Sequence, residues 1–416
     1  MGDAATATSS APHVGRADAD RTPDVIVVGA GVIGLSTAWR ATLAGLDVTV
    51  IDPAPASGAS GVAAGMLAPV TEVAYGEESL LRLNIAGARR WPDFTAELEA
   101  ATGHDIGHQR DGTLLVAFDA DDHAALRDLH GFQQHLGLEV DRRRSRECRA
   151  QEPMLSPRIR GGVFAPGDHH VDPRRTTAAL AEACRARGVT TVAQPVERID
   201  HDGERVLGVT TGDGATHTAP RVVLAAGVAS GALHGLPASV APPVRPVKGQ
   251  ILRLRSRDGT RLLSGAVRGI VQGRSIYLVP RRDDELVVGA TQEELGHDRS
   301  VTAGGVRELL DAAVAIVPGV DELTLAETAA GLRPGTPDNH PLVGATDLDG
   351  LILATGHHRH GVLLAPITAE AVVACLLGET PPAEIEVADP RRSAVTDTGP
   401  RTSDPGRRVD DVRSAS

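Results

Sequence analysis

Short apolar runs alternate with stretches of helical periodicity over most of the chain. Residues 24–28 and 47–52 are apolar runs of strand length, and residues 34–44 between them have the pattern of a helix. Apolar runs of this kind are typical of strands that a parallel sheet buries on both faces. Strand, helix and strand in this order predict the first unit of a doubly wound α/β domain.

Three strand-like runs in the middle of the chain follow one another without intervening helices, namely residues 250–254, 275–279 and 285–289. Consecutive strands of this kind favour an antiparallel sheet. Residues 351–355 and a helix over 362–377 then return to the α/β pattern. We therefore predict an α/β fold in which a discontinuous Rossmann-like domain carries an inserted α+β domain built on an antiparallel sheet.

Two local expectations concern single elements. Residues 79–101 have the pattern of a long helix, and Pro92 predicts a break in it because proline lacks an amide hydrogen. Residues 206–209 and 221–225 are predicted to be strands of one meander.

The composition is that of a globular protein, with 41% hydrophobic and 23% charged residues, and 416 residues suffice for two domains. The formal net charge is −12 and aromatic residues make up 2%, so the chain repels a phosphate backbone and offers few rings for base stacking. We therefore expect no nucleic-acid partner, and we interpret the basic run 142–146 as a solvated surface.

The chain carries no recognisable targeting or metal-binding pattern. Residues 1–21 lack the apolar core of a secretory signal, and no apolar stretch reaches the roughly 20 residues of a membrane span. Cys148, Cys184 and Cys375 form neither a CxxC motif nor a four-ligand zinc set. We expect a cytoplasmic protein with no membrane partner. The polar segments 1–21 and 388–416 are predicted to be disordered tails.

A GxGxxG motif, Gly29-Ala30-Gly31-Val32-Ile33-Gly34, follows the first predicted strand and opens the first predicted helix. Glycines at these positions allow a tight turn, close approach of the backbone to a pyrophosphate and packing of the helix on the strand. Asp52 ends the second strand, 52 − 29 = 23 residues beyond Gly29, where a carboxylate accepts hydrogen bonds from ribose hydroxyls. The unit predicts dinucleotide binding but does not by itself separate FAD from NAD.

The sequence contains no second GxGxxG motif and no redox cysteine pair, which excludes the plan of the disulfide reductases. If the cofactor is a flavin, the substrate must reduce it directly and a small acceptor must reoxidise it.

Several further segments resemble the D-amino-acid-oxidase-like flavoproteins, and most closely the glycine oxidases of thiamine biosynthesis. The segments are 60–69 (SGVAAGMLAP), 246–250 (PVKGQ), 277–281 (YLVPR), 287–291 (VVGAT), 330–338 (AGLRPGTPD) and 356–366 (GHHRHGVLLAP). In this order and spacing they extend the resemblance over about 24–380, which is nearly everything except the tails.

The resemblance implies an FAD-binding domain made of residues 22–103, 150–244 and 331–385, and a substrate or cap domain made of residues 104–149 and 245–330. Covalently flavinylated relatives have a cysteine where Gly331 stands here, so we expect non-covalent FAD.

The resemblance also assigns cofactor contacts beyond the glycine-rich turn. They comprise the small residues beside the isoalloxazine, a backbone contact to the adenine and the turn at the pyrimidine edge of the flavin. The residues are Ala59, Ser60, Ala64, Gly65, Met66, Val196, Gly227, His357, His358, Arg359, His360, Gly361, Val362 and Leu363.

By the same resemblance, Arg333 grips the substrate carboxylate, Tyr277 donates a hydrogen bond to it, and Arg359 lies near substrate and flavin. A guanidinium fork matches two carboxylate oxygens. The His-rich turn at 357–360 also invites a metal interpretation, but no acidic or cysteine partner stands at ligand spacing. We interpret the turn as a flavin contact and expect no metal.

The activity implied is the FAD-dependent oxidative deamination of glycine or another small amino acid, such as sarcosine or a small D-amino acid. The products are the imine or 2-oxo acid, ammonia and hydrogen peroxide, and the imine would serve thiazole formation. Two alternatives stay open: a dehydrogenase that passes electrons to a quinone or a protein, and a catalytically silent nucleotide-binding regulator. The expected partners are a small amino acid, O2 and further copies of the chain.

Overall fold

The computed structural model describes residues 22–392, so the tails predicted over 1–21 and 393–416 lie outside the described residues. Residues 388–392 were assigned to the second tail, yet they are folded against the protein. Ala388 is fully buried, and the Arg392 guanidinium donates to both carboxylate oxygens of Asp338, at 2.8 and 2.9 Å.

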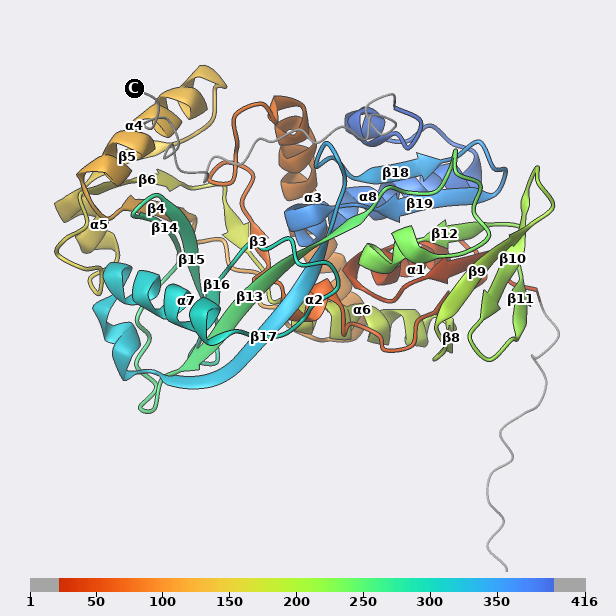
Figure 1. Ribbon diagram of the computed structural model, residues 1–416, viewed down its shortest axis with the longest axis horizontal. Helices are drawn as coiled ribbons and strands as arrows, with labels where there is room; N and C mark the ends of the chain where they lie inside the picture. Colours follow the sequence, from red (N-terminus) through yellow and green to blue (C-terminus); the bar gives the residue numbers. More distant parts are fainter. Residues whose placement is uncertain (1–21, 393–416) are drawn as a thin grey trace, which may run out of the picture.

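A six-stranded sheet forms one half of the elongated molecule (Figure 1). Its order is β18 (Leu342–Ala345), β19 (Leu351–Thr355), β12 (Val222–Leu224), β1 (Val25–Val28), β2 (Val48–Ile51) and β8 (Thr190–Val192). All pairs are parallel except β18 with β19. The strands β1 and β2 and the helix between them confirm the predicted α/β unit.

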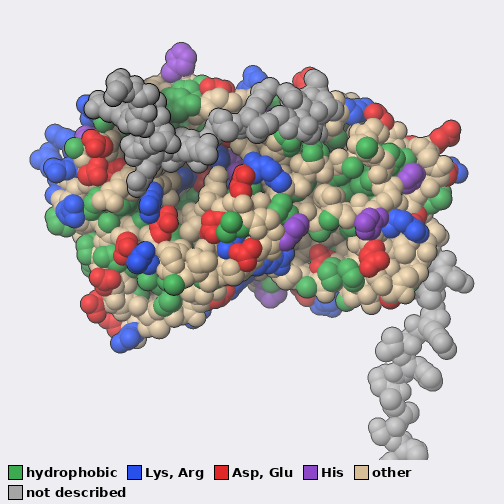
Figure 2. Space-filling view, in the orientation of Figure 1, with side chains coloured by type: hydrophobic (Ala, Val, Ile, Leu, Met, Phe, Trp, Pro, Cys, Tyr) green, Lys and Arg blue, Asp and Glu red, His purple; other side chains and the backbone are tan. Residues whose placement is uncertain are grey.

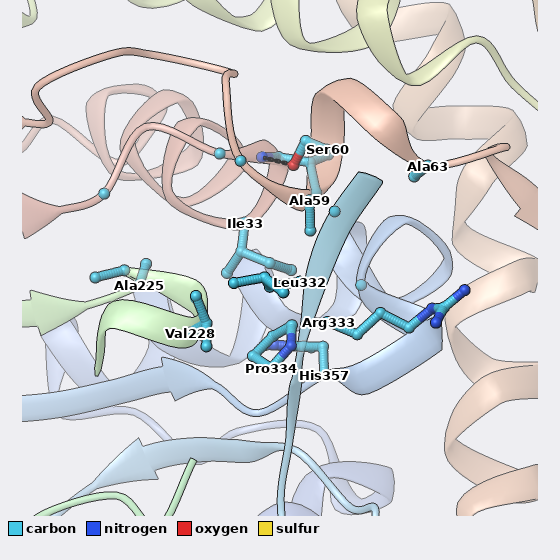
Figure 3. Close-up of a pocket in the computed structure, with 18 of the residues that line it drawn as sticks. Ile33, Ala59, Ser60, Ala63, Ala225, Val228, Leu332, Arg333, Pro334 and His357 are labelled. Atoms are coloured by element: carbon cyan, nitrogen blue, oxygen red, sulfur yellow. Dashed lines mark hydrogen bonds between the residues drawn. The ribbon is translucent and has the colours of Figure 1, made fainter. Parts of the chain in front are cut away.

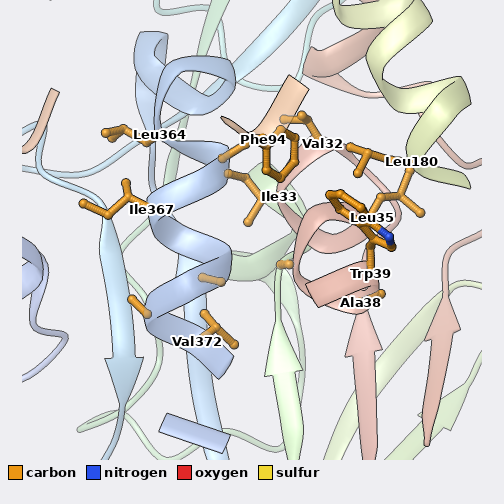
Figure 4. Close-up of a cluster of buried hydrophobic side chains, with 14 of the residues drawn as sticks. Val32, Ile33, Leu35, Ala38, Trp39, Phe94, Leu180, Leu364, Ile367 and Val372 are labelled. Atoms are coloured by element: carbon orange, nitrogen blue, oxygen red, sulfur yellow. The ribbon is translucent and has the colours of Figure 1, made fainter. Parts of the chain in front are cut away.

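Four helices pack together against this sheet, namely α1 (Val32–Leu43), α3 (Glu78–Thr102), α6 (Pro173–Ala186) and α8 (Gly361–Leu377). Their apolar side chains form a large core cluster, in which Phe94 of α3 lies between α1 and α8 and Trp39 of α1 lies beside Leu180 of α6 (Figure 4). By length and composition α8 could cross a membrane, but 72% of its apolar window is buried inside the protein. This burial accounts for its composition.

The predicted break at Pro92 is wrong, because α3 continues through it. Buried side chains stand on both sides of the proline, with Leu83 and Trp91 before it and Phe94 and Leu98 after it. The Trp91 indole also donates to the Leu363 carbonyl oxygen at 3.0 Å. Docking of the whole apolar face therefore outweighs the loss of one helical hydrogen bond.

The predicted meander is only partly correct. β9 (Val196–His201), β10 (Val206–Thr211) and β11 (Thr216–Thr218) form a small antiparallel sheet. β12 belongs instead to the six-stranded sheet, where it lies between β1 and β19. Its three residues are fully buried, as expected of a central parallel strand.

An eight-stranded sheet forms the other half of the molecule. Its order is β17 (Thr324–Gly335), β13 (Arg245–Arg255), β16 (Glu285–Gly289), β15 (Arg274–Pro280), β14 (Ala266–Val271), β4 (Thr113–Ala117), β6 (Gly161–Ala165) and β5 (Asp141–Arg144). All pairs are antiparallel except β14 with β4, which confirms the expected mainly antiparallel second sheet. β6 lies within residues 150–244, which were assigned to the FAD-binding domain, yet it pairs within this second sheet.

The helices α4 (Ala120–His135), α5 (Ser145–Gln151) and α7 (Ala303–Ile316) cover this second sheet. Its long strands β13 and β17 run from it toward the six-stranded sheet (Figure 1). The remaining short elements are α2 (Ala59–Val62), β3 (Met66–Leu67), β7 (His169–His170), and the 3-10 turns η1 (Gly227–Ala232), η2 (Pro318–Glu322), η3 (His358–His360) and η4 (Ala383–Ala388). Of these, η2 packs on α7, and η4 packs on α3 and β18. On the face shown in Figure 2, acidic and basic side chains are interspersed.

Candidate active site

A cavity of about 390 Å³ lies between the two sheets. Its size is that of a cofactor or ligand site. The turn before α1, Ala225 and Val228 line one end, and Arg333 extends from β17 toward the opposite end (Figure 3). Most of the residues that the sequence assigned to cofactor and substrate line this one cavity.

Two positions of the glycine-rich turn, Gly29 and Gly34, admit only glycine. Gly29 has a φ of +106°, and a Cβ on it would collide with the Ala225 carbonyl. A Cβ on Gly34 would overlap the Gly29 carbonyl oxygen. The N-cap Gly31 has no side chain to cap α1, so the positive end of the helix is left to a ligand or a neighbouring residue.

Asp52 and Ser60 fix this turn from two sides. The Asp52 carboxylate accepts hydrogen bonds from the amides of Ala30 and Ala54, each at 2.7 Å, and also lines the cavity. The Ser60 hydroxyl accepts from the Val32 amide at 3.0 Å (Figure 3). A carboxylate has about four acceptor positions, so Asp52 keeps capacity for ribose hydroxyls.

The segment of small residues from Ala59 at the start of α2 to Met66 forms one wall of the cavity. Ala59, Ala64, Gly65 and Met66 all line it. Gly65 has a φ of +76°, and a Cβ there would overlap the Val171 carbonyl oxygen. This wall is therefore flat backbone and short side chains, which leaves room for a planar ring system.

The predicted adenine and pyrimidine contacts line the cavity as well, namely Val196, Gly227, His357, His358, Arg359, Gly361 and Val362. His358 is 8% exposed, and neither of its ring nitrogens has a hydrogen-bond partner in residues 22–392. Burial lowers the pKa of His357 and of His358 to about 3, so both rings are neutral at pH 7. An unpartnered buried ring at the cavity wall fits a bound group with hydrogen-bonding atoms.

Three predicted contact residues do not line the cavity: Gly34, His360 and Leu363. Gly34 packs against Gly29, and Leu363 is 1% exposed in the core between α8 and its neighbours. The buried His360 ring accepts a hydrogen bond from Arg359 Nε at 3.1 Å. These residues support the cavity from behind.

Arg333 and Tyr277 face the far end of the cavity. The Arg333 guanidinium lies across Gly249, where a Cβ would overlap it, and its Nη1 donates to the carbonyl oxygens of Lys248 and Thr291 at 3.3 and 3.2 Å. No carboxylate pairs with Arg333 in the part of the chain that the structure describes. The Tyr277 hydroxyl likewise has no hydrogen-bond partner among the described residues. The remaining donors of both side chains can therefore bind an anionic group.

Arg359 lines the cavity but is already engaged. Its Nη2 lies 2.6 Å from the Glu77 carboxylate, and its Nε donates to His360. This ion pair connects the η3 turn to the start of α3 and limits the free donors that Arg359 can offer a substrate.

Two charged residues of the lining, Glu72 and Arg299, were not among the predicted site residues. Both lie in connecting segments without a motif, so no local pattern could have identified them. Lys248 was left without a role. It is fully buried, and its ammonium pairs with Asp298 at 2.5 Å and Glu293 at 3.5 Å, which holds the segment that carries Arg299.

The histidines do not form a metal centre in the structure described. Among residues 22–392, no group of three or more histidine, cysteine or acidic side chains is arranged to hold an ion. His169 and His170, the other paired histidines, lie in β7, where His170 contacts the Pro280 carbonyl oxygen at 3.2 Å.

The chain matches the family model described as FAD dependent oxidoreductase over residues 24–375. It is 36% identical over 383 residues to the bifunctional protein ThiO/ThiG of Synechocystis sp., covering 91% of this chain and 55% of that protein. It is 32% identical over 358 residues to glycine oxidase of Bacillus licheniformis, covering 85% and 93% of the two chains. The chain thus spans about half the length of the ThiO/ThiG relatives that it matches.

Among solved structures, the crystal structure of glycine oxidase from Geobacillus kaustophilus superposes with a TM-score of 0.82 at 30% identity, over 89% of this chain and 99% of that one. The glycine-rich turn, Asp52, the flat wall and the unpartnered His358 all fit the cofactor of the matched family. The chain belongs to the FAD-dependent oxidoreductases.

Proposed function

We propose that this chain is an amino-acid oxidase that acts on glycine or a similarly small amine. The observation that carries the proposal is the Arg333 guanidinium beside the Tyr277 hydroxyl at one end of the cavity, both with donors to spare. A carboxylate is the anion that a guanidinium fork matches in two bonds. Arg333 and Tyr277 then orient the amino acid with its α-carbon toward the flat wall.

Bound FAD would supply the redox chemistry, namely acceptance of a hydride from the α-carbon of the amine and transfer of the two electrons to O2 with formation of H2O2. The imine reacts with water, so glycine, O2 and water give glyoxylate, ammonia and H2O2. Small wall residues such as Ala64, Gly249 and Gly331 bring backbone close to the bound amine. The proposed substrate is therefore small. The imine of glycine is a suitable precursor for thiazole assembly in thiamine biosynthesis.

Oxygen consumption with a panel of small amines tests this function. We expect glycine, sarcosine or D-alanine to consume O2 with equimolar H2O2 and release of the 2-oxo acid. Substrate oxidation with a quinone or a dye but not with O2 would favour the dehydrogenase. No oxidation with any acceptor would leave only a nucleotide-binding role.

A further inference from the structure

Glu72 places a carboxylate at the substrate end of the cavity. The other acidic residue of the lining, Asp52, lies at the glycine-rich turn. The backbone just before Glu72 is fixed, because the buried Asp168 carboxylate accepts from the amides of Val70 and Thr71 at 3.0 and 2.7 Å. The position of Glu72 is therefore set by the fold.

The partner of Glu72 is a second guanidinium. Arg268 Nη1 lies 2.6 Å from Glu72 Oε1, and both side chains are 13% exposed. Arg268 stands opposite Tyr277 in the pairing of β14 with β15, so both side chains project from the same face of the sheet. Burial raises the pKa of Tyr277, the charges of Arg333, Arg268 and Arg281 oppose the shift, and Glu72 adds to it. Glu72 and Arg268 therefore lie close enough to the Tyr277 hydroxyl to act on it electrostatically.

No protonated histidine shares the charge of Glu72. His360 Nδ1 lies 3.5 Å from Glu72 Oε2, but the Arg359 Nε–H group donates to His360 Nε2. Burial holds the pKa of His360 well below its usual value, so the ring is neutral and carries its proton on Nδ1, toward Glu72. Arg268 is therefore the cation that neutralises Glu72.

On the basis of the proposed function, we propose that Glu72 selects amino acids with a single negative group, because it occupies Arg268 and withholds that guanidinium from the substrate. A second carboxylate on a substrate bound to Arg333 would approach the Glu72 carboxylate and meet like charge. Without Glu72, Arg268 is a buried cation that lacks its partner, and a dicarboxylic amine supplies one.

The variant Glu72→Gln tests the proposal with two substrates that share the reacting CH2–N group. Glycine has one carboxylate, and iminodiacetate has two. We expect the ratio of kcat/KM for iminodiacetate to that for glycine to rise at least tenfold in E72Q, mainly through KM. Glu139→Gln, at an exposed position outside the cavity lining, serves as the matched control and should leave the ratio unchanged.

The double variant Glu72→Gln/Arg268→Gln separates two possible causes of a gain in E72Q. One is the release of the Arg268 guanidinium, and the other is the loss of repulsion by the Glu72 carboxylate. Its ratio should fall back toward that of the wild type. An unchanged ratio in E72Q with intact glycine oxidation overturns the proposal, and so does a double variant that keeps the full gain. Flavin content and melting temperature report whether each variant is folded.

A binding measurement keeps the proposal testable without turnover. Malonate and acetate are titrated into the FAD-loaded wild-type protein while the visible flavin spectrum is followed. Acetate should bind more tightly than malonate, and tighter binding of malonate overturns the proposal even if E72Q fails to fold. A wild-type protein that oxidises no amine contradicts the proposed function. The comparison of acetate with malonate needs no turnover, so it tests the role of Glu72 independently of the proposed function.

Discussion

Arg333 shows how strand pairing prepares a buried cation for a ligand. It lies on β17 opposite Val247 of β13, and its guanidinium reaches across Gly249 to carbonyl oxygens of β13 and of the segment after β16. Burial lowers the pKa of Arg333, as expected when a charged form is removed from water. A substrate carboxylate would supply the countercharge.

Replacement of Arg333 by alanine should lower kcat/KM for glycine by a factor on the order of 30 or more. Truncation of one partner of a buried charge pair costs about 2–5 kcal/mol, and each 1.4 kcal/mol is tenfold. Steady-state kinetics and bound-flavin content check this, with the flavin content unchanged. Arg82→Ala, an exposed position on α3, is the control. Unaltered glycine kinetics in the Arg333 variant would remove this residue from the site.

At the residue scale, the sequence could predict those site residues that belong to a recognisable motif. Tyr277, Arg333, Gly29 and Gly31 occur in segments with a recognisable order, and they line the cavity. Glu72 could not be found in this way, because its meaning depends on Arg268, 268 − 72 = 196 residues away, and on the fold that brings them together.

One side chain connects the eight-stranded sheet to the wall of small residues at the cavity. Arg281 follows β15 of the eight-stranded sheet, and its guanidinium donates to the carbonyl oxygens of Ala64 and Val171, at 2.6 and 2.9 Å. Both acceptors belong to or adjoin the segment of small residues beside the predicted flavin ring. Arg281 is 3% exposed, so neither acceptor can exchange this donor for bulk water.

Arg281→Met should therefore loosen the wall that holds the cofactor. The substitution leaves two buried carbonyl groups without this donor, and each such loss lowers the free energy of unfolding by about 1–3 kcal/mol. We expect a lower melting temperature of the holoprotein and faster loss of FAD on dilution, measured by flavin fluorescence. The exposed neighbour Arg282, paired with Asp105 at 2.5 Å, provides the control Arg282→Met. Equal FAD retention in both variants would show that Arg281 does not hold the wall.

At the element scale, local patterns predicted β1, α1 and β2, which follow one another and are each set by their own periodicity. β12 was placed in the wrong sheet because both of its partners, β1 and β19, are distant in sequence. The prediction of a helix break at Pro92 was wrong because it relied on a local rule alone. The local rule against proline in a helix is sound, but the tertiary packing of α3 overrides it.

The whole molecule should lose stability in mild acid because several histidines are buried in the neutral form. Burial lowers the pKa of His170, His357 and His358 from 6.5 to about 3. The unfolded chain then binds protons more readily, so this stability is complete above about pH 6.5 and is lost as the pH falls toward 3. Burial raises the pKa of Asp168 to about 6, so this residue stabilises the folded protein at low pH. It is one group and opposes the effect of three histidines.

Melting temperatures between pH 7 and about pH 4 check this dependence. His170→Gln lies outside the cavity lining and should flatten the acid side of the profile, whereas the exposed His135→Gln should not. Identical profiles in all three proteins would contradict the assignment to buried histidines.

At the scale of the molecule, the sequence predicted an α/β half and a mainly antiparallel half, and the structure confirms both. β6 joins the eight-stranded sheet from within residues 150–244, which were assigned to the other domain. The cavity depends on both halves at once, since β1, α1 and η1 contribute one end and β15 and β17 the other. The division into domains therefore remains a prediction.

Anaerobic addition of glycine to the purified protein tests whether the cavity holds FAD next to a site for a small amine. We expect a yellow protein with bound FAD whose visible absorbance is bleached by glycine, sarcosine or D-alanine and returns when air is admitted. We also expect that Arg333→Ala keeps the colour but needs far more glycine for bleaching. A protein that does not take up FAD, or whose bound FAD is not bleached by any of the three amines, would contradict the proposed function.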